Sequence, residues 1–235
     1  MIIANTVKGK GVSFMENAVD WRSRRSMLKA EFPFVAAANG ADYDLGLGVI
    51  HRGNNNEKLY EVPAQKWADL TGSDGDFGVS VFSDSKYGWD KPDDHTLRLT
   101  CLHTPAGAFI KEARQDLMDL GRNRFGFGIY SHKGGWQTST QTAAEAFSKP
   151  LVAFQTSARK DGKLGSAFSA AALNTENALL RAFKKSEDGS GYIVRIGEAA
   201  GQAQKAVTFS VYRPIAGATP VSYTHLRAHE TGAYL

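Results

Sequence analysis

The thirty residues Glu61–Asp90, EVPAQKWADLTGSDGDFGVSVFSDSKYGWD, contain two polar and aromatic clusters separated by a turn and an apolar strand. The Gly, Asp and Ser residues of Thr71–Gly78 predict the turn, and the apolar residues of Val79–Phe82 predict the strand. If the segments on either side of the turn are neighbouring strands, both clusters lie at one end of a sheet. This stretch therefore predicts a β-hairpin whose open end carries polar and aromatic side chains.

The two clusters have the composition of a sugar-binding site. Their members are Lys66, Trp67 and Asp69 before the turn, and Asp84, Lys86, Tyr87 and Trp89 after the strand. Aromatic rings cover the C–H faces of a sugar, while charged groups hydrogen-bond its hydroxyls. The structural alternative, in which Trp67 and Trp89 only cover a sheet edge, stays open. The predicted substrate-binding residues of this stretch are Trp67, Asp84, Lys86 and Tyr87.

The composition limits the class of protein. Its 235 residues suffice for one large all-β domain or two small ones. The net charge of +4 is scattered, with local clusters at Trp21–Arg25 and Arg181–Lys185, so we predict no nucleic-acid partner. No apolar run is long enough to cross a bilayer, so we predict no membrane partner. The single cysteine, Cys101, excludes an intrachain disulfide; we predict that it is a small core residue and that the protein is cytoplasmic.

Alternation of apolar and polar residues predicts strands along most of the chain. The predicted strands and hairpins are Asn17–Phe34, Ala41–Arg52, Thr96–His103, Phe125–Trp136, Leu151–Phe154, Asn177–Gly197 and Ala206–Tyr212. Short helices are predicted at Lys111–Leu120 and Thr138–Phe147. Many short strands joined by Gly, Asn and Asp turns, with little helix, predict an all-β fold, a large antiparallel β-sandwich.

Several motifs in this sequence recur together in one enzyme family. Val62–Leu70, VPAQKWADL, and Asp84–Gly88, DSKYG, form a pair that is specific at this spacing. Further motifs are Val19–Trp21, Leu28–Pro33, and the hairpin Ala182–Gly189 with Ile193–Glu198. In these motifs the chain resembles the C-terminal β-domain of glycoside hydrolase family 38 α-mannosidases.

The resemblance covers residues 18–213 and implies a β-sandwich of the galactose-mutarotase-like supersandwich type. Members of the family are retaining enzymes that hydrolyse terminal α-mannosides with a carboxylate nucleophile, an acid/base and a zinc ion. Those groups belong to an N-terminal α/β domain, so the resemblance implies no catalytic residue, no metal ligand and no cofactor in this chain. It implies two partners, namely α-mannoside glycans and the catalytic domain of the same parent chain.

Two more candidate substrate-binding residues depend on this resemblance. The connection matched by Thr104–Arg124 approaches the active-site side in the family, and we predict Arg122 as a binding residue there. Asn123 stands where the family has a histidine. The histidine that follows the family's next strand is matched by His132. His132 either contacts sugar or is a hydrogen-bonded structural histidine at a strand end, and both interpretations stay open.

The two ends of the chain differ from the rest. Residues 1–17 resemble a short segment of transketolase; we predict a junction segment that either is foreign or leads into the next strand. Residues 221–231 resemble the translation of a sequencing adapter, so we predict a non-native tail at 216–235. Residues 18–215 are then the predicted α-mannosidase C-terminal β-sandwich domain.

Three hypotheses for function follow. In the first, this chain is inactive alone, supports the absent catalytic domain of a retaining α-mannosidase and walls its sugar pocket. In the second, it is a free-standing carbohydrate-binding β-sandwich, which would bind sugar without that domain. In the third, it is a purely structural interdomain module, which would bind no sugar and would expose an apolar face.

Overall fold

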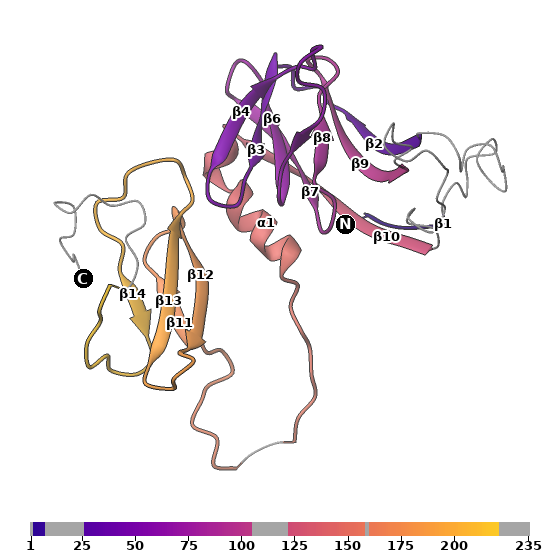
Figure 1. Ribbon diagram of the computed structural model, residues 1–235. Helices are drawn as coiled ribbons and strands as arrows, with labels where there is room; N and C mark the ends of the chain where they lie inside the picture. The colour runs from indigo at the N-terminus through magenta and orange to yellow at the C-terminus, as the bar shows by residue number, and fades with distance from the viewer. Residues whose placement is uncertain (1, 8–25, 105–121, 158–159, 221–235) are drawn as a thin grey trace. The chain divides into compact units, whose positions relative to one another are not determined.

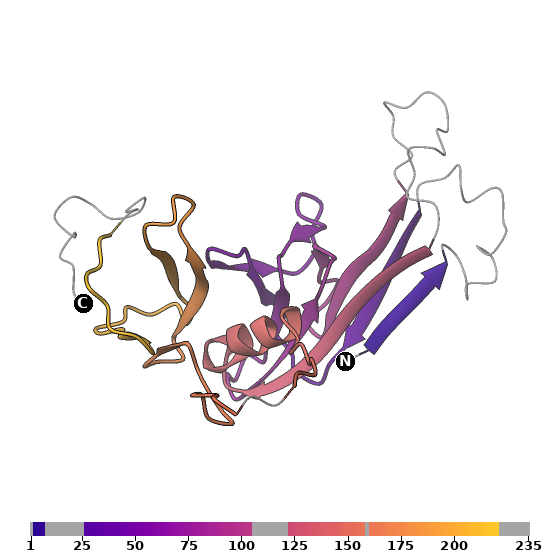
Figure 2. The ribbon, with the colours of Figure 1, turned by 90° about the horizontal axis from the view of Figure 1, so that it is seen from below.

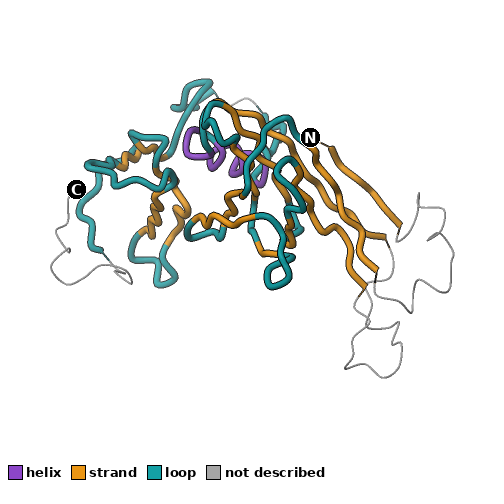
Figure 3. Tube along the Cα trace, turned by 90° about the horizontal axis from the view of Figure 1, so that it is seen from above, coloured by secondary structure: helices purple, strands orange, loops and turns teal. Residues whose placement is uncertain are grey.

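The computed structural model describes residues 2–7, 26–104, 122–157 and 160–220 (Figure 1). These residues divide into two compact units, Met1–Pro150 and Leu151–Leu235. Strands dominate, and α1 (Thr140–Ser148) is the single α-helix within these described ranges (Figure 3). The predicted all-β class is therefore confirmed.

The first unit consists of two antiparallel sheets. The larger has the order β1-β10-β7-β6-β3-β4, with bounds Ile2–Val7, Arg122–Lys133, Phe77–Ser83, Trp67–Thr71, Gly40–Asp44 and Val49–Gly53. The smaller has the order β2-β9-β8-β5, with bounds Ser26–Pro33, Thr96–Thr104, Gly88–Asp90 and Val62–Pro63. Because β8 follows β7 directly in the chain, the connection between them passes from the larger sheet to the smaller one.

The two sheets face each other across one hydrophobic core. Side chains alternate along a strand, so Leu70 of β6 enters this core while Trp67 points to the opposite face. Phe32 of β2 meets Phe127 of β10 edge to face, with ring centroids 5.1 Å apart. This contact joins the smaller sheet to the larger one, and the predicted antiparallel β-sandwich is confirmed.

The opposite face of the larger sheet is covered by α1 and by the 3-10 helix η3 (Trp136–Thr138) (Figure 2). Trp67 packs there against Trp136, with ring centroids 5.4 Å apart. Gly128 of β10 allows α1 to pack close to the sheet, because a Cβ at position 128 would lie only 3.1 Å from the ring of Phe147 in α1. The two strands β6 and β7 of the larger sheet are thus buried on both faces.

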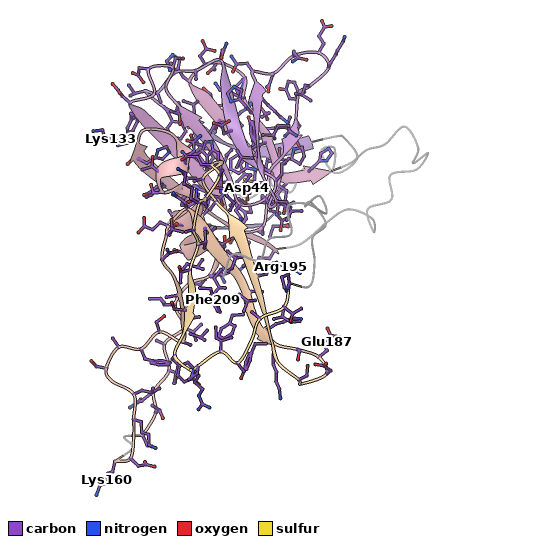
Figure 4. The ribbon with its side chains drawn as sticks, turned by 90° about the vertical axis from the view of Figure 1, so that its left-hand side faces the viewer. Asp44, Lys133, Lys160, Glu187, Arg195 and Phe209 are labelled. Atoms are coloured by element: carbon purple, nitrogen blue, oxygen red, sulfur yellow. The ribbon has the colours of Figure 1, made fainter. Side chains whose placement is uncertain are left out.

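The second unit contains two strand pairs. Its strands are β11 (Ala171–Leu173) paired with β14 (Phe209–Val211), and β12 (Ala178–Lys185) paired with β13 (Tyr192–Glu198). Phe183 of β12 contacts Phe209 of β14, which is labelled in Figure 4, with ring centroids 5.8 Å apart. In the described part of this unit the buried hydrophobic residues are Ala178, Ala199 and Ala200. The second unit therefore has little apolar core.

Several predicted elements are confirmed. The turn at Thr71–Gly78 joins β6 to β7, and the strand predicted at Thr96–His103 is β9. The hairpin at 177–197 is β12–β13, and the helix at 138–147 is α1 preceded by η3. Cys101 is buried in the sandwich core, and this burial raises the pKa of its thiol. The prediction of a small core residue is therefore confirmed for Cys101.

The single strand predicted at Ala41–Arg52 is wrong, because the segment is the hairpin β3–β4. The Leu45 N–H donates a 2.8 Å hydrogen bond to the Gly48 carbonyl and so closes a turn in the middle of the segment. Gly46 has a φ of 81° in this turn, a conformation that suits glycine. The alternation of apolar residues that predicted one strand therefore runs through the turn between β3 and β4.

The strand predicted at Leu151–Phe154 is also wrong, since this segment lies outside every described strand. A strand requires a hydrogen-bonded neighbour, and the sequence of the segment does not supply one. The helix predicted at Lys111–Leu120 lies outside the described residues. The same holds for most of the connection Thr104–Arg124.

Candidate functional site

The open end of the β6–β7 hairpin gathers the two predicted clusters. Trp67 pairs in register with Phe82, and the Ser83 N–H donates a 2.9 Å hydrogen bond to the Lys66 carbonyl. Lys66 is held by Asp44, labelled in Figure 4, whose carboxylate accepts a 3.1 Å hydrogen bond from the Lys66 N–H. Lys66, Trp67 and the beginning of the β7–β8 connection therefore lie at one end of the larger sheet, whereas Trp89 belongs to β8 of the smaller sheet.

Asp84 begins the connection between β7 and β8 and is tied to β10. Its Oδ1 accepts a 2.9 Å hydrogen bond from the Gly126 N–H and a 2.7 Å hydrogen bond from the Ser85 hydroxyl. The Asp84 N–H in turn donates to the Gly126 carbonyl at 3.2 Å. Gly126 makes room for this carboxylate, because a Cβ there would lie 2.7 Å from Asp84 Oδ2. These contacts fix the beginning of the connection.

Lys86 and Tyr87 follow in the same connection. The Lys86 N–H donates to the Ser83 hydroxyl at 2.9 Å, and the Lys86 ammonium lies 5.7 Å from the centre of the Phe125 ring. The Tyr87 side chain is 54% exposed, while its carbonyl accepts a 3.0 Å hydrogen bond from the Ala64 N–H. The backbone is anchored while the aromatic ring stays accessible to solvent.

We call Asp84–Tyr87 the candidate loop. It presents an exposed phenol ring within four residues of a carboxylate and an ammonium group. Such a set suits a hydroxyl-rich ligand, because the ring covers apolar C–H faces and the charged groups hydrogen-bond hydroxyls. Since the backbone contacts already hold the loop in place, a ligand would lose little free energy in ordering it.

Trp67 lies at the same end of the sheet but on the covered face. Its side chain has no exposed surface and packs against Trp136. A sugar would reach this ring only if α1 and η3 moved away from the sheet. Trp89 is also fully buried, in the core between the two sheets. The structure thus buries both indole rings, in two different hydrophobic clusters.

The other two predicted residues lie on β10, away from the candidate loop. Arg122 is the exposed first residue of this strand, four positions before Gly126, which corresponds to about 13 Å along a strand. His132 pairs with Gly78 and lies six positions after Gly126, roughly 20 Å along the strand in the other direction. The structure therefore brings together Asp84, Lys86 and Tyr87 and leaves Arg122 and His132 apart from them.

His132 belongs to a buried hydrogen-bonded network on the face that α1 covers. Its Nε2 lies 2.7 Å from Asp69 Oδ2, and its Nδ1 lies 3.0 Å from the Gly134 carbonyl oxygen. The two ring nitrogens of His132 thus face a carboxylate oxygen and a backbone carbonyl oxygen. Asp69 also accepts 2.6 Å hydrogen bonds from the hydroxyls of Thr71 and Ser80. This geometry favours the structural alternative for His132.

Sequence reasoning missed this network and its connection to the helix. Ser80 Oγ lies 2.8 Å from Oγ1 of Thr140, the first residue of α1, so the network joins three strands to the helix. The available signal was Asp69, a carboxylate inside an otherwise apolar strand, because a buried carboxylate requires partners. Its partner His132 is 63 positions away, a separation that spacing along the sequence does not reveal.

A second network, also missed, lies on the outer face of the smaller sheet. Arg98 donates to Asp90 Oδ1 from Nε at 2.7 Å and from Nη2 at 2.6 Å, and Lys29 donates to Oδ2 of the same carboxylate. Burial alone would raise the pKa of Asp90, but the hydrogen bonds from Lys29, Asn55 and Arg98 outweigh that effect and hold the pKa below its ordinary value. The network therefore ties β2, β8 and β9 together.

Metal ligands and membrane-spanning helices were sought only within the described ranges of the chain. There, no three His, Cys, Asp or Glu side chains form a group that could hold a metal ion. Among the same residues, no helix combines the length and the apolar character needed to cross a membrane.

Known proteins resemble this chain over its sandwich. The sequence profile of the glycosyl hydrolases family 38 C-terminal domain matches residues 7–107. Residues 7–107 are therefore similar to that C-terminal domain. The family 38 match spans β2 to β9 and so includes the candidate loop and the Asp90 network.

Full-length relatives of the family 38 domain are much longer than this chain. Alpha-mannosidase G of Dictyostelium discoideum is 28% identical over 197 residues, which make up 80% of this chain and 17% of that protein. Alpha-mannosidase 2C1 of Mus musculus is 29% identical over 175 residues, 72% of this chain and 16% of that protein. The chain therefore spans less than one fifth of the length of these relatives.

Two solved structures share the fold of the family 38 domain. A family 38 protein from Enterococcus faecalis has a TM-score of 0.67 at 19% identity, covering 79% of this chain and 22% of that one. An alpha-mannosidase from Enterococcus faecalis V583 has a TM-score of 0.62 at 20% identity, covering 72% of this chain and 20% of that one. At these identities the likeness supports the fold alone.

Proposed function

We propose that this chain is the C-terminal β part of a retaining α-mannosidase that hydrolyses terminal α-mannosides. The observation that carries the proposal is the family 38 match over residues 7–107. Further support comes from two relatives that are named alpha-mannosidase. The chain matches 17% of the length of one and 16% of the length of the other. The catalytic domain of the same parent chain is then its main partner, and this chain alone turns over no mannoside.

In this proposal the candidate loop walls one side of the sugar pocket. The exposed ring of Tyr87 covers a C–H face of the α-mannoside, and Lys86 and Asp84 hydrogen-bond its hydroxyls. The nucleophile, the acid/base and the zinc ion belong to the catalytic domain, where the metal would hold sugar hydroxyls. The contribution of this chain is to position the substrate.

We further propose a cytoplasmic location. The support is the single cysteine of the sequence, Cys101, which is buried and paired with no other cysteine. A protein with this cysteine content requires no oxidising compartment in order to fold.

The proposal is tested by reassembly. The purified chain is assayed with an aryl α-mannoside and zinc, alone and after co-expression with alpha-mannosidase G of Dictyostelium discoideum shortened to end before the segment that this chain matches. We expect no turnover by the chain alone and turnover by the two pieces together. Zinc-dependent turnover by the chain alone, or none by the reassembled enzyme, would contradict the proposal.

The candidate loop has its own test in the reassembled enzyme. Tyr87→Ala should raise KM roughly tenfold, because a ring contact of about 1–1.5 kcal/mol is lost. Tyr60→Ala is the matched control, since Tyr60 is 56% exposed, is also in the first unit and hydrogen-bonds Arg98 instead. An unchanged KM for Tyr87→Ala would show that the candidate loop does not contact the substrate.

A second candidate function is a free-standing carbohydrate-binding module. The exposed Tyr87 ring beside Lys86 favours it, because such a platform needs no catalytic domain to contact a sugar. Titration of the chain alone with methyl α-mannoside distinguishes the two functions. Saturable binding that Tyr87→Ala abolishes would favour this second function over the first.

A further inference from the structure

The segment Leu151–Phe154 is an apolar run that is exposed to solvent. Its side chains are almost fully exposed, with 102% for Leu151, 85% for Val152 and 84% for Phe154. It also lies outside every described helix and strand. Apolar side chains of this size are normally removed from water, so an exposed run of them marks an interaction site.

The composition of the segment is that of a buried strand. Residues 151–157, LVAFQTS, contain no charged side chain, and Pro150 precedes them. Valine and phenylalanine favour strands, and a short apolar run after a proline is typical of a strand buried on both faces. The strand predicted here is absent from the described structure, although the residues that favour a strand are present.

The backbone donors and acceptors of this segment are paired in no described strand. Such a segment pairs readily with the free edge of a sheet in another polypeptide, with the backbone giving affinity and alternate side chains giving specificity. In that pairing Val152 and Phe154 would share one face, because side chains alternate along a strand. The occupant of this site is therefore a sheet edge flanked by an apolar surface.

Resting on the proposed function, we propose that Leu151–Phe154 is a docking strand that adds to a sheet edge in the remaining part of the α-mannosidase. More than four fifths of the length of each relative lies outside the segment that this chain matches, so ample polypeptide exists to supply the edge. The lack of charge in residues 151–157 fits a surface that is permanently covered, because obligate interfaces are depleted in charged groups.

The test uses the full chain, tagged and co-expressed with the shortened alpha-mannosidase G. Ala153→Pro removes one backbone donor and keeps the segment uncharged, while Val152→Asp places a charge on the docking face. Either change should reduce recovery of the shortened enzyme with the tagged chain at least tenfold. Leu47→Asp is the matched control, because Leu47 is 99% exposed in the β3–β4 turn. This variant should recover as much shortened enzyme as the unchanged chain does.

Two further measurements separate docking from folding. Circular dichroism and the Tm of the chain alone should be the same for all variants, since the segment forms no strand there. Hydrogen exchange of the amides of residues 151–157 should slow at least tenfold in the complex and stay fast in the chain alone. Exchange that is equally fast in the complex would overturn the proposal.

The outcomes also separate this inference from the proposed function. If all variants recover the shortened enzyme to within twofold of the unchanged chain, the docking strand is wrong and the proposed function is unaffected. Failure of the unchanged chain to recover it would overturn both. A dimer of the chain alone that Ala153→Pro dissolves would assign the segment to self-association and so overturn the docking strand.

Discussion

Both units of this protein contain paired strands, but the two units bury very different side chains. In the first unit the larger sheet is covered on both faces, and Trp67, Trp89 and Tyr43 are almost completely removed from water. In the described part of the second unit the buried hydrophobic residues are alanines, while Tyr192 remains 72% exposed. Paired strands are therefore not sufficient for a stable unit, because stability follows the apolar area that is buried.

Hydrogen exchange should show the largest difference between the two units. Amides of β7, which lies in the middle of the doubly covered sheet, should exchange only when the first unit unfolds. Amides of β13, in a two-stranded sheet with little core, should exchange on the order of a thousandfold faster. Mass spectrometry of peptides from both strands measures this ratio, and similar rates would contradict the contrast between the units.

Trp67→Ala should lower the free energy of unfolding of the first unit by about 3–5 kcal/mol, because it empties the space between the sheet and η3. The equivalent change in the second unit, Tyr192→Ala, should change the free energy of unfolding by no more than about 0.5 kcal/mol, since the side chain is mostly exposed. Denaturant titration followed by fluorescence measures both. Equal effects would mean that the second unit has a core of its own.

His132→Ala should lower the free energy of unfolding of the first unit by about 3 kcal/mol, because it leaves the buried Asp69 carboxylate without its imidazole partner. Its comparison is His51→Ala, since the side chain of His51 is 63% exposed and its hydrogen bond to Asp42 lies near solvent. This control should cost no more than about 1 kcal/mol. If both histidines proved equally important, the buried network would have no special role in holding α1.

The smallest expected effect is on the stability of the first unit at acidic pH. The pKa of Asp90 lies below its ordinary value of 3.8 in the folded chain, so the ionised form stabilises the fold above the unfolded-state pKa. That stabilisation should be lost as the pH falls through the folded-state pKa, below 3.8. Asp90→Asn should cost about 1–3 kcal/mol at neutral pH and flatten this acid dependence.

A carboxylate of the second unit provides the comparison for the acid experiment. The hydrogen bonds from Ser186 and Ser190 lower the pKa of Asp188 to about 2, but this side chain lies on an exposed turn. Asp188→Asn should therefore leave the unfolding transition of the first unit unchanged at every pH. A shift in that transition would show that the two units unfold together.

The fold was largely predictable because its signals are local. The glycine and aspartate residues of Thr71–Gly78 specify a turn, and the alternation of Leu97, Leu99 and Cys101 specifies a buried strand face. The β3–β4 turn escaped prediction because the apolar alternation continues through Gly46. Local patterns report local geometry, and they fail where a reversal of the chain preserves the same pattern.

The candidate site was less predictable, because it depends on what covers each face. A tryptophan in an amphipathic strand can be expected at a surface, yet Trp67 belongs to a sheet that is covered on both sides. Neither the position of α1 nor the pairing of Asp69 with His132 can be read from spacing, since both arise from the tertiary fold. Asp84, Lys86 and Tyr87 lie together because one short loop contains all three.

Gly126 shows how a position without a side chain can constrain a distant loop. The Asp84 carboxylate occupies the space that any larger residue at position 126 would need. A side chain at position 126 would force this carboxylate to shift, so the two positions are expected to covary in evolution. Ligand preference among homologues would then be inherited through a residue that itself touches no ligand.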